Sequence, residues 1–238
     1  MATNESHIPH EVYFAFLDRT IEIHWNYHAL LMSAIWVFLV PLCITIIRYG
    51  KPRPTEHGVR SKVSFWNKEW WWFSIHKYGL YTAVLLSLAG LFVALVVSQG
   101  FSGSVHSILG LLTIVMGCLQ AVSGMLRGTH GGKFYYTAQP DDPQSWQGDH
   151  YSRTTRRRIF EAYHKTSGYF AVLFAIGAVG SGLMQYPMPV LAGILLGLPF
   201  AFLGVWVVLE YQERRYDGYR AVHGFGLEHP YNKEREYL

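Results

Sequence analysis

The sequence predicts an all-α membrane protein with five transmembrane helices, the first four of which form a bundle. Half of the 238 residues are hydrophobic and only 15% are charged, against about 25% in an average soluble domain. The apolar residues gather in runs of about 20, the length of helix that crosses a hydrocarbon core. Glycines recur inside these runs, where they let membrane helices approach closely. Composition and patterning together indicate a packed helical bundle in a membrane.

We expect the five spans, in chain order, at 26–47, 75–97, 105–126, 164–186 and 189–210. Pro41 and Pro199 fall within the first and last spans, and packed membrane helices tolerate proline because neighbouring groups satisfy the freed backbone. The alternative, a large soluble helical core, would require five such runs with almost no charge on any face. The spans define one transmembrane domain, residues 26–210.

Three polar segments flank or interrupt this domain. Residues 1–25 include "PHEVYFAFLDRTIEIHW", which mixes apolar and charged residues at helix-like spacing, so we expect an interfacial segment or a plain tail. Residues 127–160 form a loop long enough to carry function, and 211–238 is expected to be a tail. The tryptophans of "EWWWF" (69–73) are typical of an aromatic belt at the membrane interface.

The positive charges are concentrated on one side of the predicted membrane. Lysines and arginines crowd the connections after the first and third spans and the tail after the fifth, at Arg48, Lys51, Arg53, Arg60, Lys62, Lys68, Arg127, Lys133, Arg153, Arg156, Arg157, Arg158, Arg214, Arg215 and Arg220. On the other side only Arg19 is found. The positive-inside rule predicts an outer N-terminus and a cytoplasmic C-terminus, in the plasma membrane or a bacterial inner membrane. Because this bias accounts for the net charge of +4, we do not expect nucleic acid as a partner.

Each of the first four spans carries a histidine near its N-terminal end: His28, His76, His106 and His164. An ionisable residue inside a span is costly and by default indicates function. Because successive spans alternate in direction, two of these histidines lie near the outer side and two near the cytoplasmic side. His24, four residues before His28, is the alternative on the first span. The remaining histidines are expected to be solvated: His7, His10, His57, His130, His150, His223 and His229.

Two histidines at the same depth on parallel helices can bind one haem iron through both imidazoles. The first and third spans supply one pair, His28 with His106, and the second and fourth supply His76 with His164. Zinc competes for such pairs, but a zinc site needs three or four protein ligands. The sequence therefore predicts two non-covalent b haems stacked across the membrane.

Basic residues accompany the predicted cytoplasmic haem. Lys77 and Lys165 directly follow two of the ligands, and Arg48 and Arg127 end the first and third spans. Their positive charge would neutralise haem propionates and favour the reduced iron. The same side chains could also attract an anionic reductant. The alternative is that these side chains only snorkel to the interface and orient the chain.

The histidine motifs resemble the four-helix core of the cytochrome b561 family, in "HALLM", "IHKYGLY", "SVHSILG" and "YHKTSGYF", over residues 28 to about 210. The resemblance implies two haems held by the same histidine pairs, and electron transfer across the membrane, often from ascorbate to ferric iron or monodehydroascorbate. Ascorbate-dependent members carry "ALLVYR" where this chain has "CITIIR", which keeps only Arg48. Their "SLHSW" appears as "SVHSI", without the tryptophan.

Bis-histidine iron has no open position, which favours outer-sphere electron transfer over oxygen chemistry. The expected partners are membrane lipid and a redox donor and acceptor, which could be small molecules, quinone or a carrier protein. One alternative is a haem-bearing anchor subunit of a larger quinone-linked oxidoreductase, and the chain could also be a homodimer. Another is a haem-free transporter or scaffold whose histidines relay protons or bind metal.

Overall fold

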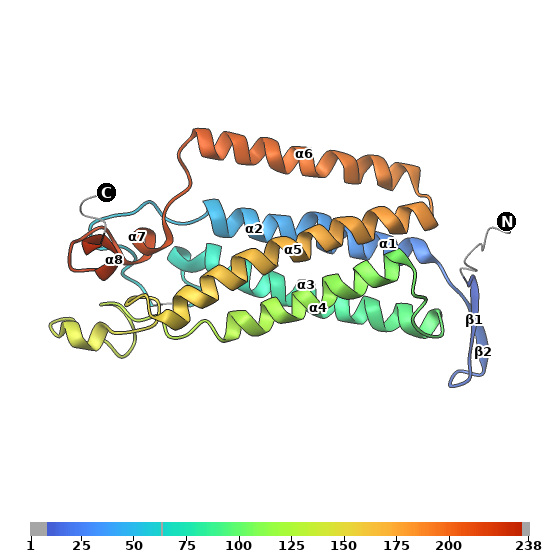
Figure 1. The fold of residues 1–238 in the computed structure, drawn as a ribbon, viewed down its shortest axis with the longest axis horizontal. Coiled ribbons are helices and arrows are strands. Elements are labelled where there is room, and N and C mark those ends of the chain that lie inside the picture. Colours follow the sequence, from blue (N-terminus) through green and yellow to red (C-terminus); the bar gives the residue numbers. More distant parts are fainter. Residues whose placement is uncertain (1–8, 63, 235–238) are drawn as a thin grey trace.

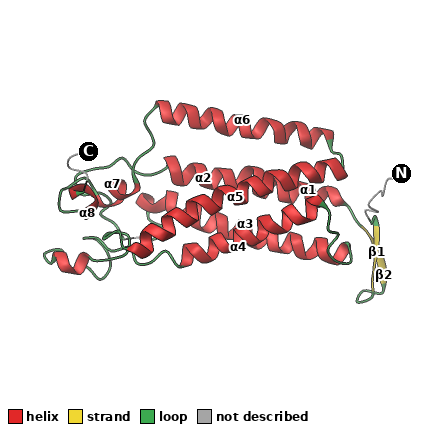
Figure 2. Cartoon of the chain, viewed as in Figure 1, coloured by secondary structure: helices red, strands yellow, loops and turns green. Residues whose placement is uncertain are grey.

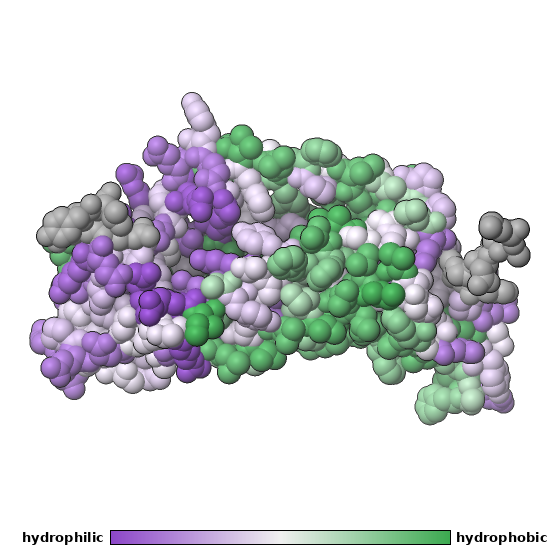
Figure 3. All heavy atoms as spheres, in the orientation of Figure 1, coloured by the Kyte–Doolittle hydropathy of each residue, from purple (hydrophilic) through white to green (hydrophobic). Residues whose placement is uncertain are grey.

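The computed structural model describes residues 9–62 and 64–234, which are mostly helical (Figures 1 and 2). Five helical segments of this part are long and apolar enough to cross a membrane. The first comprises α1 (Trp25–Ser33), the π-helical η1 (Ala34–Leu39) and α2 (Val40–Tyr49); the others are α3 (Trp71–Val97), α4 (Val105–Met125), α5 (Thr155–Gln185) and α6 (Pro189–Tyr211). Hydrophobic residues cover the middle of the molecule in Figure 3, and hydrophilic ones gather at the end that carries α7 (Gly218–His223) and α8 (Pro230–Lys233). The chain is therefore built as a membrane-embedded protein.

The π-helical turn in the first span comes just before a proline. Pro41 cannot donate a backbone hydrogen bond, and its ring would crowd the carbonyl one turn earlier; the wider turn at 34–39 relieves this conflict. The same turn buries three consecutive residues, Ile35, Trp36 and Val37. Trp36 Nε1 donates to Ser87 Oγ of α3 at 3.0 Å, so the irregular turn joins the first two spans.

The first four spans share one core. Small residues of α3 and α5 (Ala83, Ala171 and Ala175) pack against Ile35, Trp36 and Val40, with Met116 of α4 beside them. α6 runs along the outside of this bundle, next to α2 (Figure 1), and Leu191 is its one buried residue. Its polar attachments include a hydrogen bond from Trp206 Nε1 to Thr45 Oγ1, at 2.8 Å, and an ion pair between Glu210 and Arg48, at 2.6 Å. The Tyr49 hydroxyl also donates to Glu210, at 3.0 Å.

The fourth span starts earlier than its hydropathy predicts. α5 begins at Thr155 instead of near residue 164, because Thr154 caps it by accepting a hydrogen bond from the Arg157 backbone N–H. An ion pair between Arg157 and Glu161 follows one turn later. The first turns of α5 are polar, so a hydropathy window assigns them to the loop although the backbone is helical.

The N-terminal segment, expected to be an interfacial segment or a plain tail, contains a β-hairpin although its apolar and charged residues have helix-like spacing. β1 (Glu11–Phe14) pairs antiparallel with β2 (Arg19–Glu22), so that Val12 faces Ile21. Asp18 adopts a positive φ in the turn, and its carboxylate accepts a hydrogen bond from the Tyr13 hydroxyl at 2.7 Å. This closure stabilises a hairpin over the helix that the spacing of charges favours.

At the opposite end, segments that are distant in sequence fold together. We call this region the C-terminal cap, defined as residues 50–62, 64–70, 127–154 and 212–234. It contains η2 (Lys68–Trp70), η3 (Pro143–Trp146), α7 (Gly218–His223) and α8 (Pro230–Lys233). The Val59 N–H donates to the Val222 carbonyl at 2.9 Å, and both side chains pack with Trp70 and Trp72. These two tryptophans are 3% and 5% exposed, so they are buried in protein and do not form the predicted aromatic belt; Trp71 is 45% exposed.

Asp149 closes the long loop of the cap. Its carboxylate accepts hydrogen bonds from the Thr154 hydroxyl (2.6 Å), the Thr129 N–H (2.9 Å) and the Thr129 hydroxyl (3.1 Å). The Thr154 hydroxyl, and then the Thr129 N–H, hold the pKa of Asp149 below its ordinary value. The stabilisation that ionised Asp149 gives to the fold is therefore complete at pH values above its ordinary pKa. It is lost as the pH falls through its lowered pKa in the folded state.

Replacing Asp149 with alanine is expected to open this loop. Loss of the charge-assisted hydrogen bonds should speed proteolysis within 127–154 by about tenfold at neutral pH. Limited proteolysis in detergent would measure the effect. Asp141→Ala is the matched control, because Asp141 is exposed in the same loop; equal cleavage rates for the two variants would show that Asp149 does not hold the loop.

Candidate functional site

The first histidine pair lies at the end of the bundle that carries the β-hairpin. His28 is in the first turn of α1 and His106 is the second residue of α4. Their ring centres are 6.2 Å apart and the ring planes are at 84°. Both side chains are half-buried, so this part of the structure places two imidazoles face to edge between helices.

The second pair lies at the end of the bundle next to the C-terminal cap. His76 of α3 and His164 of α5 have ring centres 6.4 Å apart and planes at 72°. Both are half-buried. The structure thus brings together His28 with His106 and His76 with His164, because the helices that carry each pair enter the bundle from the same end.

In three of the four histidines, Nδ1 is held by a neighbouring helix. His106 Nδ1 lies 2.8 Å from the Ala178 carbonyl, and His76 Nδ1 lies 3.2 Å from the Cys43 carbonyl. A carbonyl only accepts, so Nδ1 carries the proton in both rings and Nε2 keeps a free lone pair. An imidazole fixed in this way is oriented to bind a metal through Nε2.

His164 Nδ1 contacts two side chains of α4, Ser123 and Gln120. Its Nδ1 lies 2.8 Å from Ser123 Oγ, and Ser123 donates its own proton to the Gln120 carbonyl at 2.9 Å. The Gln120 side-chain amide nitrogen donates to the same Nδ1 at 2.9 Å, so two side chains of α4 orient this ring. α4 thus supplies a ligand candidate at one end, His106, and a ligand-orienting group at the other, Ser123.

If the second pair binds haem as the sequence predicts, Ser123→Ala should weaken that binding by about 10- to 100-fold, because the histidine would lose a group that orients it. Haem titration of protein depleted of the cofactor would measure this. The matched control is Thr113→Val on the same helix, since the Thr113 hydroxyl donates to the Leu109 carbonyl of its own helix. If both substitutions leave affinity unchanged, Ser123 does not orient His164.

Two glycines allow the close approaches around these rings. A Cβ at Gly182 of α5 would lie 2.8 Å from His106 Nδ1, so a side chain there would displace the ring. A Cβ at Gly79 of α3 would lie 2.6 Å from Cys43 Sγ, so this glycine lets α3 pack on α2 at the level where the Cys43 carbonyl meets His76.

His24 is placed differently from His28. It is exposed, precedes α1, and its ring contacts Tyr27 at 5.8 Å. The ring that faces His106 is that of His28. The geometry therefore favours His28 over His24 as the first-span partner.

The basic residues expected at the cytoplasmic site lie in three different settings. Arg48 is engaged by α6 through Glu210 and lies over the Trp206 ring at 5.7 Å. Arg127 lies over the Phe73 ring at 4.6 Å and lines a cavity in the cap. Lys77 lies over the Tyr78 ring at 4.9 Å, and Lys165 is exposed. Arg48 therefore has a structural partner, whereas Arg127 lies where the cap meets α3.

Most of the histidines expected to be solvated are enclosed in the C-terminal cap. His150 and His229 are buried, and His130 and His223 are half-buried and in ring contact with His150. Burial lowers the pKa of His130 to about 3, and it lowers the pKa of His150 and His223 well below the usual value, so all three are neutral at pH 7. The prediction of solvated side chains is wrong for these four residues. It holds for His10 and His57, which are exposed, while His7 lies outside the described residues.

Comparison of the chain with models of protein families, with curated proteins and with solved structures found no match. The five apolar helices place the chain among membrane-embedded proteins. Within the described residues, the two histidine pairs between these helices are the arrangement that points most directly to a chemical role.

Proposed function

We propose that this chain is a cytochrome b561-like protein that binds two b-type haems and carries electrons across the membrane. The observation that supports this most strongly is the presence of two histidine pairs at opposite ends of one helical bundle. In each pair one ring, His106 or His76, is fixed through Nδ1 by a backbone carbonyl, so that its Nε2 is free. His28 and His106 would hold one haem, and His76 and His164 the other.

The spacing within each pair fits this assignment. Two imidazoles that bind one iron from opposite faces, with metal–nitrogen bonds of about 2.0 Å and a ring radius of roughly 1.1 Å, have ring centres about 6.2 Å apart. The observed separations are 6.2 Å and 6.4 Å. Direct hydrogen bonding within a pair would bring the rings closer, as it does for His150 and His223, whose centres are 4.9 Å apart.

The two pairs are separated along the membrane normal. His106 and Ser123, the partner of His164, are 17 residues apart on α4, which corresponds to about 25 Å of helix. Along α5, His164 and Ala178, the partner of His106, are 14 residues apart, or about 21 Å. The pairs therefore lie near opposite faces of a hydrocarbon core about 30 Å thick.

A bound haem supplies a one-electron carrier whose iron changes between the ferric and ferrous states. The chain's own residues fix the imidazoles, and the apolar helices exclude water from the bundle. With two histidines to hold the haem at each site, the sites would exchange electrons and would leave no position at iron for oxygen or substrate.

We place the donor at the C-terminal cap and the acceptor at the hairpin end. The cap contains a cavity of about 440 Å³ lined by Arg127, Lys62 and Lys133, among others. These cations would attract an anionic reductant. The positive-inside bias of the loops predicts that the same end is cytoplasmic, which supports this direction.

Sealed vesicles test the proposed function. Haem-loaded protein is reconstituted with ascorbate inside and ferricyanide outside, two anions that do not cross the bilayer. External ferricyanide should be reduced in proportion to the protein present. The control is a chain with both His76→Ala and His106→Ala. If haem-loaded protein reduces ferricyanide no faster than this control, transmembrane electron transfer is excluded.

A further inference from the structure

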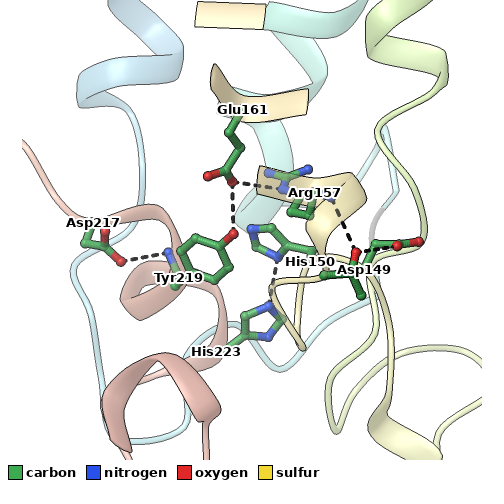
Figure 4. Close-up of polar contacts among 8 residues, drawn as sticks. Asp149, His150, Arg157, Glu161, Asp217, Tyr219 and His223 are labelled. Atoms are coloured by element: carbon green, nitrogen blue, oxygen red, sulfur yellow. Dashed lines mark hydrogen bonds and ion pairs between the residues drawn. The ribbon is translucent and has the colours of Figure 1, made fainter. Parts of the chain in front are cut away.

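Three histidines from distant segments meet inside the C-terminal cap. His130 follows α4, His150 precedes α5, and His223 ends α7. One potential ligand nitrogen from each lies within 4.8 Å of the others. The rings of His150 and His223 meet nitrogen to nitrogen (Figure 4). His150 Nδ1 lies 2.8 Å from His223 Nε2. This group is separate from the two histidine pairs between the helices.

The backbone is built to bring His130 and His150 together. A Cβ at Gly148 would lie 2.6 Å from the Gly131 Cα, so the two loop segments touch where neither has a side chain. Two backbone hydrogen bonds join the segments, from the His150 N–H to the Thr129 carbonyl and from the Tyr151 N–H to the His130 carbonyl, both at 3.0 Å. The imidazoles of His130 and His150 then stack with centres 4.7 Å apart.

One nitrogen of this group has no partner within the described chain. The Nε2 of His130 is buried and makes no hydrogen bond. A buried polar nitrogen without a partner is costly, and a bound ion is one of the standard explanations for it. The adjacent nitrogens of His150 and His223 have only each other.

Neighbouring aromatic rings fix the orientation of His150 and His223. His150 stacks on Tyr219 with centres 4.6 Å apart, and the Tyr219 hydroxyl donates to Glu161 at 3.1 Å. Glu161 also pairs with Arg157, which offsets the positive charge of that side chain (Figure 4). On the other side, His223 stacks on His229 with centres 4.8 Å apart. Such outer contacts orient metal-binding imidazoles.

We propose that His130, His150 and His223 form a binding site for a divalent transition metal ion, of which zinc suits the ligands best. Three neutral imidazoles without carboxylate select zinc, copper or nickel and disfavour magnesium and calcium. Nitrogens that bind one tetrahedral zinc lie about 3.3 Å apart, a value within the range from 2.8 Å to 4.8 Å found here. Three protein ligands leave the fourth position for water or another ligand, and all three histidines lie at or beside the cap cavity.

A metal ion bound here would hold three segments together: the loop after α4, the loop before α5, and helix α7. Aromatic contacts also link this site to the start of α3, the helix that carries His76. The ring centre of Trp70 lies 5.2 Å from that of His130 and 6.2 Å from that of Phe73, which is in the first turn of α3. The proposal does not depend on electron transfer or on haem.

The experiment measures zinc and haem in the same sample of full-length protein purified in detergent. The protein is treated with a chelator, incubated with excess zinc chloride, desalted, and analysed by mass spectrometry for zinc and by absorbance for haem. We expect about one zinc per wild-type chain and at least a tenfold loss in His130→Gln, His150→Gln and His223→Gln. His57→Gln is the matched control, because this exposed histidine lines the same cavity.

X-ray absorption at the zinc edge of the wild-type chain gives a second test that needs no variant. We expect about three imidazole nitrogens at about 2.0 Å. Absence of zinc from the wild type, zinc content that is unchanged in all three variants, or a shell dominated by oxygen would each overturn the proposal. Because haem is measured separately, loss of haem with zinc retained counts against the proposed function and not against the metal site.

Discussion

Replacing His76 with alanine is expected to remove one of the two proposed haems and leave the other in place. His164 would then be the one remaining ligand on that side, and haem affinity would fall because an axial bond is lost. Alanine is a strong helix former, and His76 is half-buried in an apolar helix, so α3 should persist. The haem-to-protein ratio, measured after conversion to the pyridine complex, should be halved.

Complementary variants give this experiment its controls. His106→Ala should remove the haem at the hairpin end, and the double variant should retain neither. His24→Ala should keep both, because His24 is exposed and lies against Tyr27. Full haem content in His76→Ala would contradict the assignment of the second pair, and loss of one haem in His24→Ala would move the first-span ligand from His28 to His24.

Replacing Gly182 with alanine is expected to weaken binding of the proposed haem at the hairpin end, with little change to the fold. The new Cβ would lie 2.8 Å from His106 Nδ1 and 2.9 Å from Cε1, which forces the ring away from the Ala178 carbonyl. We expect haem affinity at that site to fall by about 10- to 100-fold, as for other losses of ligand orientation. Titration of depleted protein with haem should resolve one weakened site and one unchanged site.

Gly180→Ala is the matched control for this substitution. Gly180 lies on the same helix, and a Cβ there would meet no atom of the described chain within 4 Å. Both variants replace a helical glycine with alanine, so they share any effect on helix propensity. Equal haem affinities in the two variants would show that the His106 ring position does not control binding.

The membrane helices could be predicted from the sequence because their signals are local. The long apolar runs fix where a helix crosses the membrane, and the alternating direction of successive spans sorts His28, His76, His106 and His164 into two depths. The helix ends were less predictable. The polar start of α5 depends on the Thr154 cap and the Arg157–Glu161 pair, which a hydropathy window does not register.

The C-terminal cap could not be predicted because its contacts join distant and irregular segments. Two examples are the backbone hydrogen bond between Val59 and Val222 and the contact of Gly131 with Gly148. Both depend on how the loops fold over the bundle. The burial of His150 follows from those contacts and leaves no periodic pattern. The glycines at 131, 132 and 148 were the available signal, since glycine in a loop marks positive φ or close backbone approach. The sequence also predicts Trp70 and Trp72 at the lipid interface, because composition does not distinguish lipid from protein surroundings.

The haem content of the purified chain, measured together with its oxidised and reduced spectra, tests the proposed function most directly. We expect two non-covalent b haems per chain, both low-spin and six-coordinate, because each iron would be bound by two histidines. Protein that is folded, produced with ample haem and still free of it would contradict the central claim.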